Sequence, residues 1–133
     1  NFSGEELGLY GSKYLVEHLP VQVGTINYML NMDMVGRLNS ERVLSIGGVG
    51  TSPQIKSLLD NLSAGDIKIK KTESGIGPSD HTSFYLKNIP VLFFFTGQHA
   101  DYHKPTDKMK RLLLVFKTIG ITVGLEKIIK QYK

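Results

Sequence analysis

PVLFFFT, residues 90–96, belongs to the longest apolar run of the chain, which extends from Ile89 to Thr96. The run has the length of a strand and is far shorter than the roughly 20 residues that a membrane helix needs. A strand that is apolar at every position is typical of a sheet covered on both faces. We therefore expect Pro90–Thr96 to be an interior strand of an α/β sheet.

Strands and helices alternate around this run, which predicts a three-layer α/β/α sandwich with a mixed, mostly parallel sheet. The other expected strands are Thr25–Val35, Val43–Ile46 and Ile67–Lys71, and Phe2 has the position of the last residue of one more strand. The expected helices are Leu9–Leu19, one with Ser52 as its N-cap, Pro53 in its first turn and Gly65 at its end, a short one at Ser79–Leu86, and an amphipathic one at Lys108–Tyr132.

The composition is that of a folded domain, with 133 residues, 41% hydrophobic and 21% charged. No cysteine is present, which excludes disulfides and thiolate metal sites. The net charge is +4, but the lysines are spread along the chain without interleaved aromatic residues. We therefore expect no nucleic-acid partner.

The unusual polar residues lie where the expected strands end, which is where α/β sheets bind ligands. The adjacent Glu5 and Glu6 stand in FSGEELGLYGS, residues 2–12, and Asp33 interrupts an apolar run. His99, Asp101, Tyr102 and His103 follow the buried strand. Each residue also has an ordinary interpretation by itself. Asp33 could cap a loop, and His103 could be an exposed loop histidine. Asp107, slightly further along the chain, could cap the last helix.

Together, carboxylates and imidazole in one cleft form a ligand set that suits catalytic zinc. This reading explains the adjacent glutamates, because one can bind the metal while the other takes a proton from metal-activated water. Gly4 relieves the steric limits of that turn. The field of neighbouring carboxylates raises the pKa of the free glutamate toward a useful range.

Four motifs in register resemble the co-catalytic two-zinc aminopeptidases of the bacterial leucyl aminopeptidase type. They are FSGEELGLYGS (2–12), NMDMVGR (31–37), SDHTSFYLKNIPVLFFFTG (79–97) and HADYHKPTD (99–107). The resemblance implies an exopeptidase that hydrolyses the N-terminal bond of a peptide substrate.

The roles that the resemblance implies fall on seven residues. Glu5 is the general base, Tyr102 stabilises the oxyanion, Glu6 and His103 bind one zinc ion, Asp33 binds the other, and Asp80 and Asp107 orient ligands.

Two of the family's five protein ligands, a histidine in a His-x-Asp segment and an aspartate that bridges both metals, have no match in the chain. HAD at 99–101 has the His-x-Asp pattern but lies inside the downstream motif. We therefore expect residues 1–133 to be the C-terminal portion of a single catalytic domain, inactive alone. The resemblance also implies secretion or a place in the periplasm or cell envelope.

Three alternatives remain. A glutaminyl cyclase-like acyltransferase shares the fold, although EELGLYGS and NMDMVGR have the peptidase form. A catalytically dead homologue could serve as a binding domain, although the site residues are retained. A phosphate-binding module could use GGVGTSP (47–53) or SGIGPSD (74–80), but both lack the lysine and the spacing of a phosphate loop.

Overall fold

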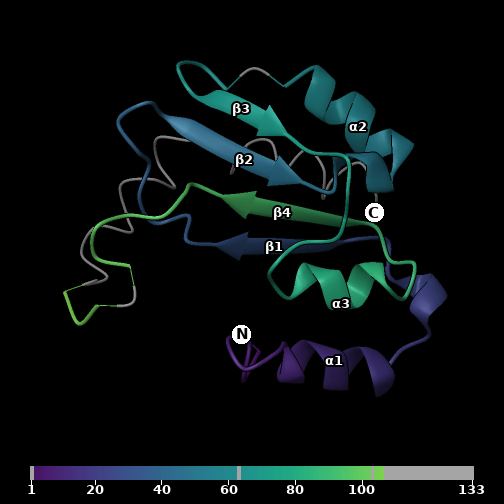
Figure 1. Ribbon diagram of the computed structural model, residues 1–133. Helices are drawn as coiled ribbons and strands as arrows, with labels where there is room; N and C mark the ends of the chain where they lie inside the picture. Colours follow the sequence, from purple (N-terminus) through teal and green to yellow (C-terminus); the bar gives the residue numbers. More distant parts are fainter. Residues whose placement is uncertain (1, 63, 103, 107–133) are drawn as a thin grey trace.

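The described residues form a four-stranded sheet with helices on both faces (Figure 1). The computed structural model of the protein describes residues 2–62, 64–102 and 104–106. In chain order the elements are α1 (Tyr10–Glu17), the 3₁₀ turn η1 (Val23–Thr25), β1 (Met29–Asp33), β2 (Val43–Gly47), the 3₁₀ turn η2 (Val49–Thr51), α2 (Pro53–Asp60), β3 (Lys68–Lys71), α3 (His81–Tyr85) and β4 (Val91–Phe95). Among these described residues, no helix is long and apolar enough to cross a membrane.

The strand order is β1-β4-β2-β3, so β4 lies inside the sheet as its sequence predicted. β4 runs parallel to β1 and antiparallel to β2, and β2 runs parallel to β3. The mixed, mostly parallel sheet is therefore confirmed. Val91 and Leu92 are 0% exposed, which explains why β4 carries apolar residues at successive positions.

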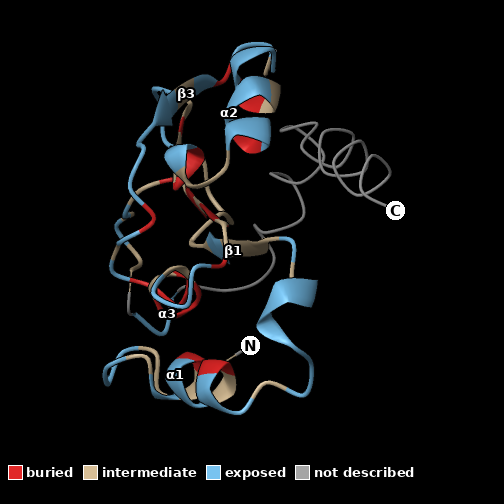
Figure 2. Cartoon of the chain, turned by 90° about the vertical axis from the view of Figure 1, so that its right-hand side faces the viewer, coloured by how far each residue is buried: buried red, intermediate tan, exposed pale blue. Residues whose placement is uncertain are grey.

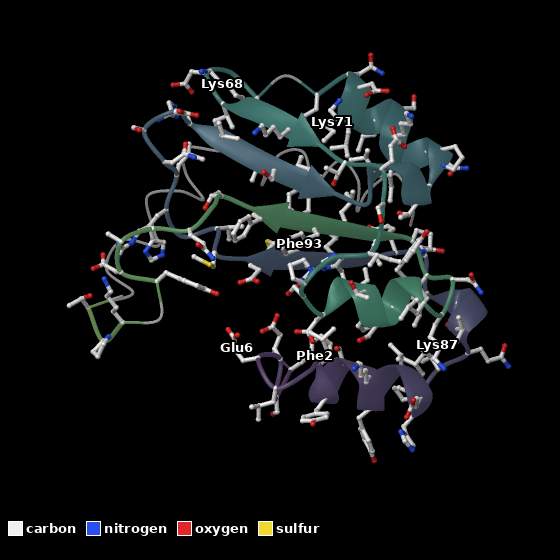
Figure 3. All side chains as sticks on the ribbon, viewed as in Figure 1. Phe2, Glu6, Lys68, Lys71, Lys87 and Phe93 are labelled. Atoms are coloured by element: carbon white, nitrogen blue, oxygen red, sulfur yellow. The ribbon has the colours of Figure 1, made fainter. Side chains whose placement is uncertain are left out.

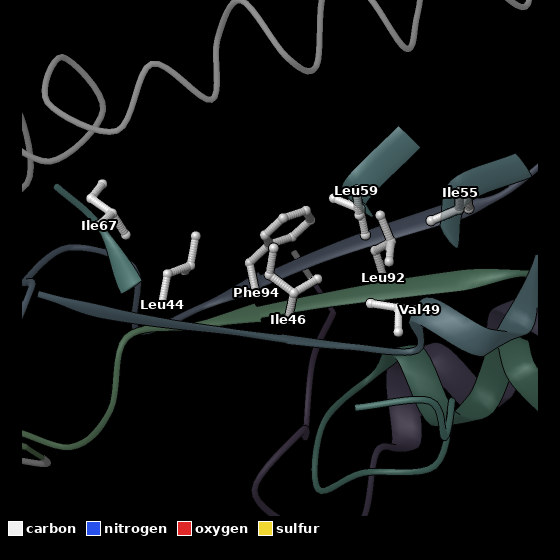
Figure 4. Packing of buried hydrophobic residues seen from close by; sticks show 8 residues of the cluster. All are labelled: Leu44, Ile46, Val49, Ile55, Leu59, Ile67, Leu92 and Phe94. Carbon is white, nitrogen blue, oxygen red and sulfur yellow. The ribbon is translucent and has the colours of Figure 1, made fainter. Parts of the chain in front are cut away.

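One face of the sheet packs against α2 (Figure 4). The side chains of Ile55 and Leu59 on α2 join a cluster with residues that alternate along the strands, as period-2 strand geometry requires. The buried members of this cluster are Leu44, Ile46, Val49, Ile55, Leu59, Ile67, Leu92 and Phe94.

The opposite face packs against α3, and α1 lies outside α3 (Figures 1 and 2). Val16 of α1 and Phe84 of α3 form a second cluster with Val91 of β4 and Ile89. A buried hydrogen bond of 2.9 Å joins the hydroxyls of Ser12 and Ser83, and so ties α1 to α3. Helices thus cover both faces of the sheet, and the three-layer architecture is confirmed.

Two expected strands are corrected. The strand expected from Thr25 begins only at Met29, because Val23–Thr25 turns back on itself. In that turn both the backbone N–H and the hydroxyl of Thr25 donate to the carbonyl of Gln22. Phe2 lies outside the strands, and its ring packs at 5.8 Å between centroids against the ring of Phe84.

The helices are shorter than their patterns indicated. α1 ends at Glu17, ahead of Pro20, because the N–H of the capping residue His18 turns back to the carbonyls of Tyr14 and Leu15. α3 covers only His81–Tyr85 of the expected Ser79–Leu86.

α2 begins at Pro53 and ends at Asp60, five residues before Gly65. Ser52 has the N-cap position, but its hydroxyl donates to the side-chain oxygen of Gln54 and not to the backbone. The N-cap position predicted for Ser52 is therefore confirmed, although its hydroxyl forms no capping hydrogen bond with the backbone. The helix expected at Lys108–Tyr132 lies outside the described residues.

Candidate active site

Glu5 and Glu6 lie on a tight turn just before α1. Figure 3 shows Glu6 on the side of that helix where the sheet lies. The N–H of Gly11 donates to the carbonyl of Ser3 at 2.8 Å, which fastens the start of the turn to the first turn of α1. A Cβ on Gly11 would meet the backbone N and O of Ser3 at 2.6 and 2.7 Å, so only glycine allows this approach. Gly4 has a φ of +65°, and the role predicted for it in the turn is confirmed.

Asp33 is the last residue of β1 and pairs in register with Phe95 at the end of β4. The chain then turns sharply through Met34, which has a φ of +51°. The buried hydroxyl of Thr96 holds this turn, because it lies 2.5 Å from the backbone carbonyls of Met34 and Arg37. Asp33 therefore lies at the carboxyl end of two parallel strands, where an α/β sheet presents its ligand site.

Ser79, Asp80 and His81 form the third part of the site, at the start of α3. All three are buried, with exposures of 3%, 7% and 1%. The ring of His81 stacks on Phe93 of β4 with centroids 4.3 Å apart and planes within 10°. This contact lays the start of α3 against the same face of the sheet that carries Asp33.

The carboxylates from these three segments share one region. Burial raises the pKa of Glu5, the hydrogen bond from Ser79 lowers it in part, and the charges of Glu6, Asp33 and Asp80 raise it further. Burial likewise raises the pKa of Asp33, again with a lowering hydrogen bond from Ser79 and raising charges from Glu6 and Asp80. The structure thus brings together four of the seven predicted site residues, drawn from segments as far apart as positions 5 and 80.

The loop after β4 holds the remaining predicted residues. Tyr102 is half-buried, and its N–H donates to the carbonyl of His99 at 2.9 Å. Asp101 forms an ion pair with Arg37, which links this loop to the loop that follows Asp33. His103 and Asp107 lie outside the described residues.

The donor set fits a divalent cation in its chemistry. Several desolvated carboxylates repel one another, and a dication offsets that repulsion. Asp80 Oδ1 is buried and has no hydrogen-bond partner among the described residues, so an oxygen donor remains available beside the cluster. Within the described part of the chain, however, no three His, Asp or Glu side chains are arranged to hold a metal ion.

Sequence reasoning missed three residues of this region. Within the SDH motif, only Asp80 was predicted to have a role in the site, and Ser79 and His81 were not. No role was predicted for Asn31 either, whose side chain donates to the Ser79 hydroxyl at 2.9 Å. The available signal was period 2: Asn31 stands two residues before Asp33 on β1, so both side chains lie on the same face of the sheet.

The two glycine-rich stretches do not form phosphate loops. The N–H groups of Val49 and Gly50 donate to the carbonyls of Thr72 and Glu73, and that of Gly77 donates to the Thr82 hydroxyl. These backbone donors are already used within the protein, which removes the basis for that alternative.

Comparisons with known proteins identify a family and a shared fold. The model of peptidase family M28 matches residues 1–115. Leupeptin-inactivating enzyme 1 of Streptomyces exfoliatus is 37% identical over 105 residues, which cover 77% of this chain and 23% of that protein.

Two solved structures show the same fold. The zinc aminopeptidase of Bacillus subtilis superposes with a TM-score of 0.67 at 22% identity, over 96% of this chain and 34% of its own. The LapA aminopeptidase of Legionella pneumophila superposes with a TM-score of 0.63 at 23% identity, over 94% of this chain and 37% of its own. The chain therefore spans about a quarter to two fifths of the length of these relatives.

Proposed function

Since the chain belongs to peptidase family M28, we propose that it supplies part of the catalytic centre of a zinc-dependent aminopeptidase. The observation that carries this proposal is the convergence of Glu5, Glu6, Asp33 and Asp80 from three separate segments. A cluster of like charges on a partly buried face destabilises a fold unless a cation or a protonated member offsets it. Metal-assisted hydrolysis needs a bound cation, and it also needs a carboxylate that takes up a proton.

Glu6 and His103 would hold one zinc ion and Asp33 the other. When bound, zinc polarises the substrate carbonyl and makes water more acidic. Glu5 is the proposed general base, which takes the proton of the attacking water and returns it to the leaving amine. Its raised pKa supports this role, because a base that must also release its proton works best when its pKa approaches the working pH.

The other predicted residues assist. Tyr102 is proposed to donate from its hydroxyl to the oxyanion that develops on the carbonyl. Asp80 and Asp107 are proposed to orient the ligands, and the buried position of Asp80 beside the cluster supports its part.

We also propose that residues 1–133 do not hydrolyse peptides alone, since three matched ligands divided between two zinc positions leave at most two protein ligands for each ion. Robust aminopeptidase turnover by the purified 133-residue chain would contradict this. Secretion or a place in the cell envelope also remains a proposal, to be tested by fractionating the source cells.

The test of the mechanism compares Glu5→Gln and Glu6→Gln in the full-length protein. Glu5→Gln keeps the shape and removes the base, so kcat should fall about 10²- to 10⁴-fold, while bound zinc and KM change little. Glu6→Gln should lower zinc affinity, and excess zinc should restore part of the activity. Glu17→Gln, an exposed glutamate at the far end of α1, is the matched control and should leave all three quantities unchanged.

Metal analysis and steady-state kinetics on a chromogenic aminoacyl anilide give these quantities. Loss of zinc in Glu5→Gln with retention in Glu6→Gln would show that the two roles are reversed. A wild-type protein that binds zinc and cyclises N-terminal glutamine without hydrolysing peptides would establish the acyltransferase instead. A wild-type protein that binds no zinc would leave the binding-domain alternative.

A further inference from the structure

We propose that Lys70, assisted by Lys68, is a specificity-determining residue that attracts a carboxylate of the peptide substrate. This carboxylate is either the C-terminus of a short peptide or an acidic side chain near the bond that is cleaved. The inference rests on the proposed function, since it adds a class of substrate to that site. It depends on the register of the sheet, which brings both lysines onto the face that carries Asp33.

The alternation of side chains along β3 places the two lysines on the α3 face of the sheet, the face against which α3 packs. Ile69 packs against the cluster that contacts α2. The ammonium group of Lys71 lies 2.8 Å from the carboxylate of Asp60 on α2. Because successive side chains of a strand point to opposite faces, Lys68 and Lys70 lie on the other side, and both are exposed.

A row of residues in register joins Lys70 to the carboxylates of the site. Asp33 pairs with Phe95 of β4, and Phe95 pairs with Ser45 of β2. Ser45 in turn pairs with Lys70. Since neighbouring strands lie about 4.8 Å apart, three spacings put the Cα atoms of Asp33 and Lys70 about 14 Å apart.

The middle of this row lies on the α3 face as well. Phe95 stacks on Phe93 with ring centroids 5.9 Å apart, and Phe93 stacks on His81 of α3. Ser45 stands between two residues of the cluster that contacts α2, so its side chain points to the opposite face. α3 packs against β1 and β4, while β3 lies at the far edge of the sheet (Figure 1). Phe95 and Ser45 are only half-buried, so the surface along the row is partly open.

The charges around β3 leave these two lysines available. Among the residues that the structure describes, neither Lys68 nor Lys70 forms an ion pair. Three acidic side chains near β3 are paired with other cations, in the pairs Arg42–Asp66, Lys56–Glu73 and Lys71–Asp60. The α3 face is therefore acidic at the β1 end of the row and basic at the β3 end.

The distance along the row suits a short peptide. Five bonds separate Cα from Nζ, so an extended lysine side chain reaches roughly 6 Å. About 8 Å then remains between the ammonium group of Lys70 and the Cα atom of Asp33, which is the length of about two extended residues. A carboxylate within about two residues of a bond cleaved beside Asp33 therefore comes within range of the ammonium group.

The experiment measures kcat/KM of the full-length protein on three pairs of substrates that differ by one negative charge. Leucyl-glycyl-glycine and its amide report on the C-terminal carboxylate. Leucyl-glutamyl amide and leucyl-glutaminyl amide report on an acidic second residue, and aspartyl and asparaginyl p-nitroanilide report on an acidic first residue. The wild type should prefer the anionic member of at least one pair by about 2- to 5-fold, and that pair identifies the source of the carboxylate.

Lys70→Gln should abolish this preference and leave kcat/KM on the neutral member at the wild-type value. Lys70→Glu should reverse the preference, and an ionic strength of about 1 M should weaken it in the wild type. The matched control is Lys71→Gln, which removes the same charge one residue further along β3 but on the face of α2. Its preference should equal that of the wild type.

The outcomes separate this inference from the proposed function. A wild type that hydrolyses both members of every pair equally would overturn the role of Lys70 and leave the peptidase intact, as would an unchanged preference in Lys70→Gln. An equal loss of preference in Lys71→Gln would show that the total charge of the protein decides it, and the role of Lys70 would again be wrong. A wild type that hydrolyses none of these peptides would overturn both proposals.

Discussion

Lowering the pH from 7 to 4 should destabilise the protein through His81. The side chain is 1% exposed and stacked on Phe93. Burial lowers the pKa of His81 from 6.5 to about 4, against a smaller raising effect of Asp80. Protonation would also place a proton on Nδ1, facing the N–H of Asn31 at 3.4 Å.

The direction of the effect comes from the two pKa values. The unfolded chain takes up the proton as the pH falls through 6.5, while the folded chain takes it up only near pH 4. The contribution of neutral His81 to the unfolding free energy is therefore present in full above pH 6.5, and it is lost progressively as the pH falls to about 4. At 1.36 kcal/mol for each pH unit, the gap corresponds to about 3 kcal/mol of unfolding free energy.

The assay is urea unfolding at pH 7, 5.5 and 4 for the wild type and for His81→Asn, with EDTA in every sample. Asparagine keeps an acceptor near the position of Nδ1 and cannot titrate. Glu5 and Asp33, whose pKa values are raised, contribute an opposite slope in both proteins, and this contribution cancels in the difference.

The variant should be less stable at pH 7, because it loses the ring stacking on Phe93. Between pH 7 and 4 the unfolding free energy of the wild type should fall by about 3 kcal/mol more than that of the variant. A gap between the two proteins that stays constant with pH would refute the reasoning, because it would mean that His81 titrates alike in the folded and unfolded states.

Three other substitutions test the frame around the site. Leu92→Ala, at a position that is 0% exposed, should lower the unfolding free energy in urea by about 2–5 kcal/mol. Gly11→Ala would bring a Cβ within 2.6 Å of the Ser3 backbone. This variant should therefore displace the turn that carries Glu5 and Glu6 and lower kcat. Its control is Gly24→Ala, whose added Cβ would meet nothing within 4 Å and should leave kcat unchanged. Thr96→Val leaves two carbonyls of the loop after β1 without their donor and should cost about 1–3 kcal/mol in the same urea assay; a loss below 0.5 kcal/mol would show that water replaces the hydroxyl.

The sheet could be predicted where burial decides the residue types. β4 is apolar at every position because helices cover both of its faces, and this requirement is visible in the sequence itself. The expected strand from Thr25 failed at its start, because a local hydrogen bond from Thr25 to Gln22 outweighs the β propensity of that segment. Phe2 is likewise of a residue type that is common in strands, but it lies outside the strands and its ring packs on Phe84.

The candidate site could be predicted as far as residue types reveal chemistry. Adjacent glutamates in a glycine-punctuated turn and an aspartate in an apolar run are costly without a function, so Glu5, Glu6 and Asp33 stand out in one dimension. Asparagine and serine are ordinary in loops and on strands, so Asn31 and Ser79 do not. The importance of Gly11 could not be predicted either, because position 11 requires glycine only through its close contact with the Ser3 backbone.

The sequence by itself therefore determined the α/β class, the interior strand and the acidic character of the site, because burial and charge restrict residue types wherever they occur. Only the tertiary structure decided which side chains meet. Asn31 lies 48 positions from Ser79 and 50 from His81, and their contacts depend on the packing of α3 over the face of β1 and β4. Hydrogen bonds need alignment within a few tenths of an ångström, and such alignment between distant segments is a property of the packed sheet and not of any local pattern.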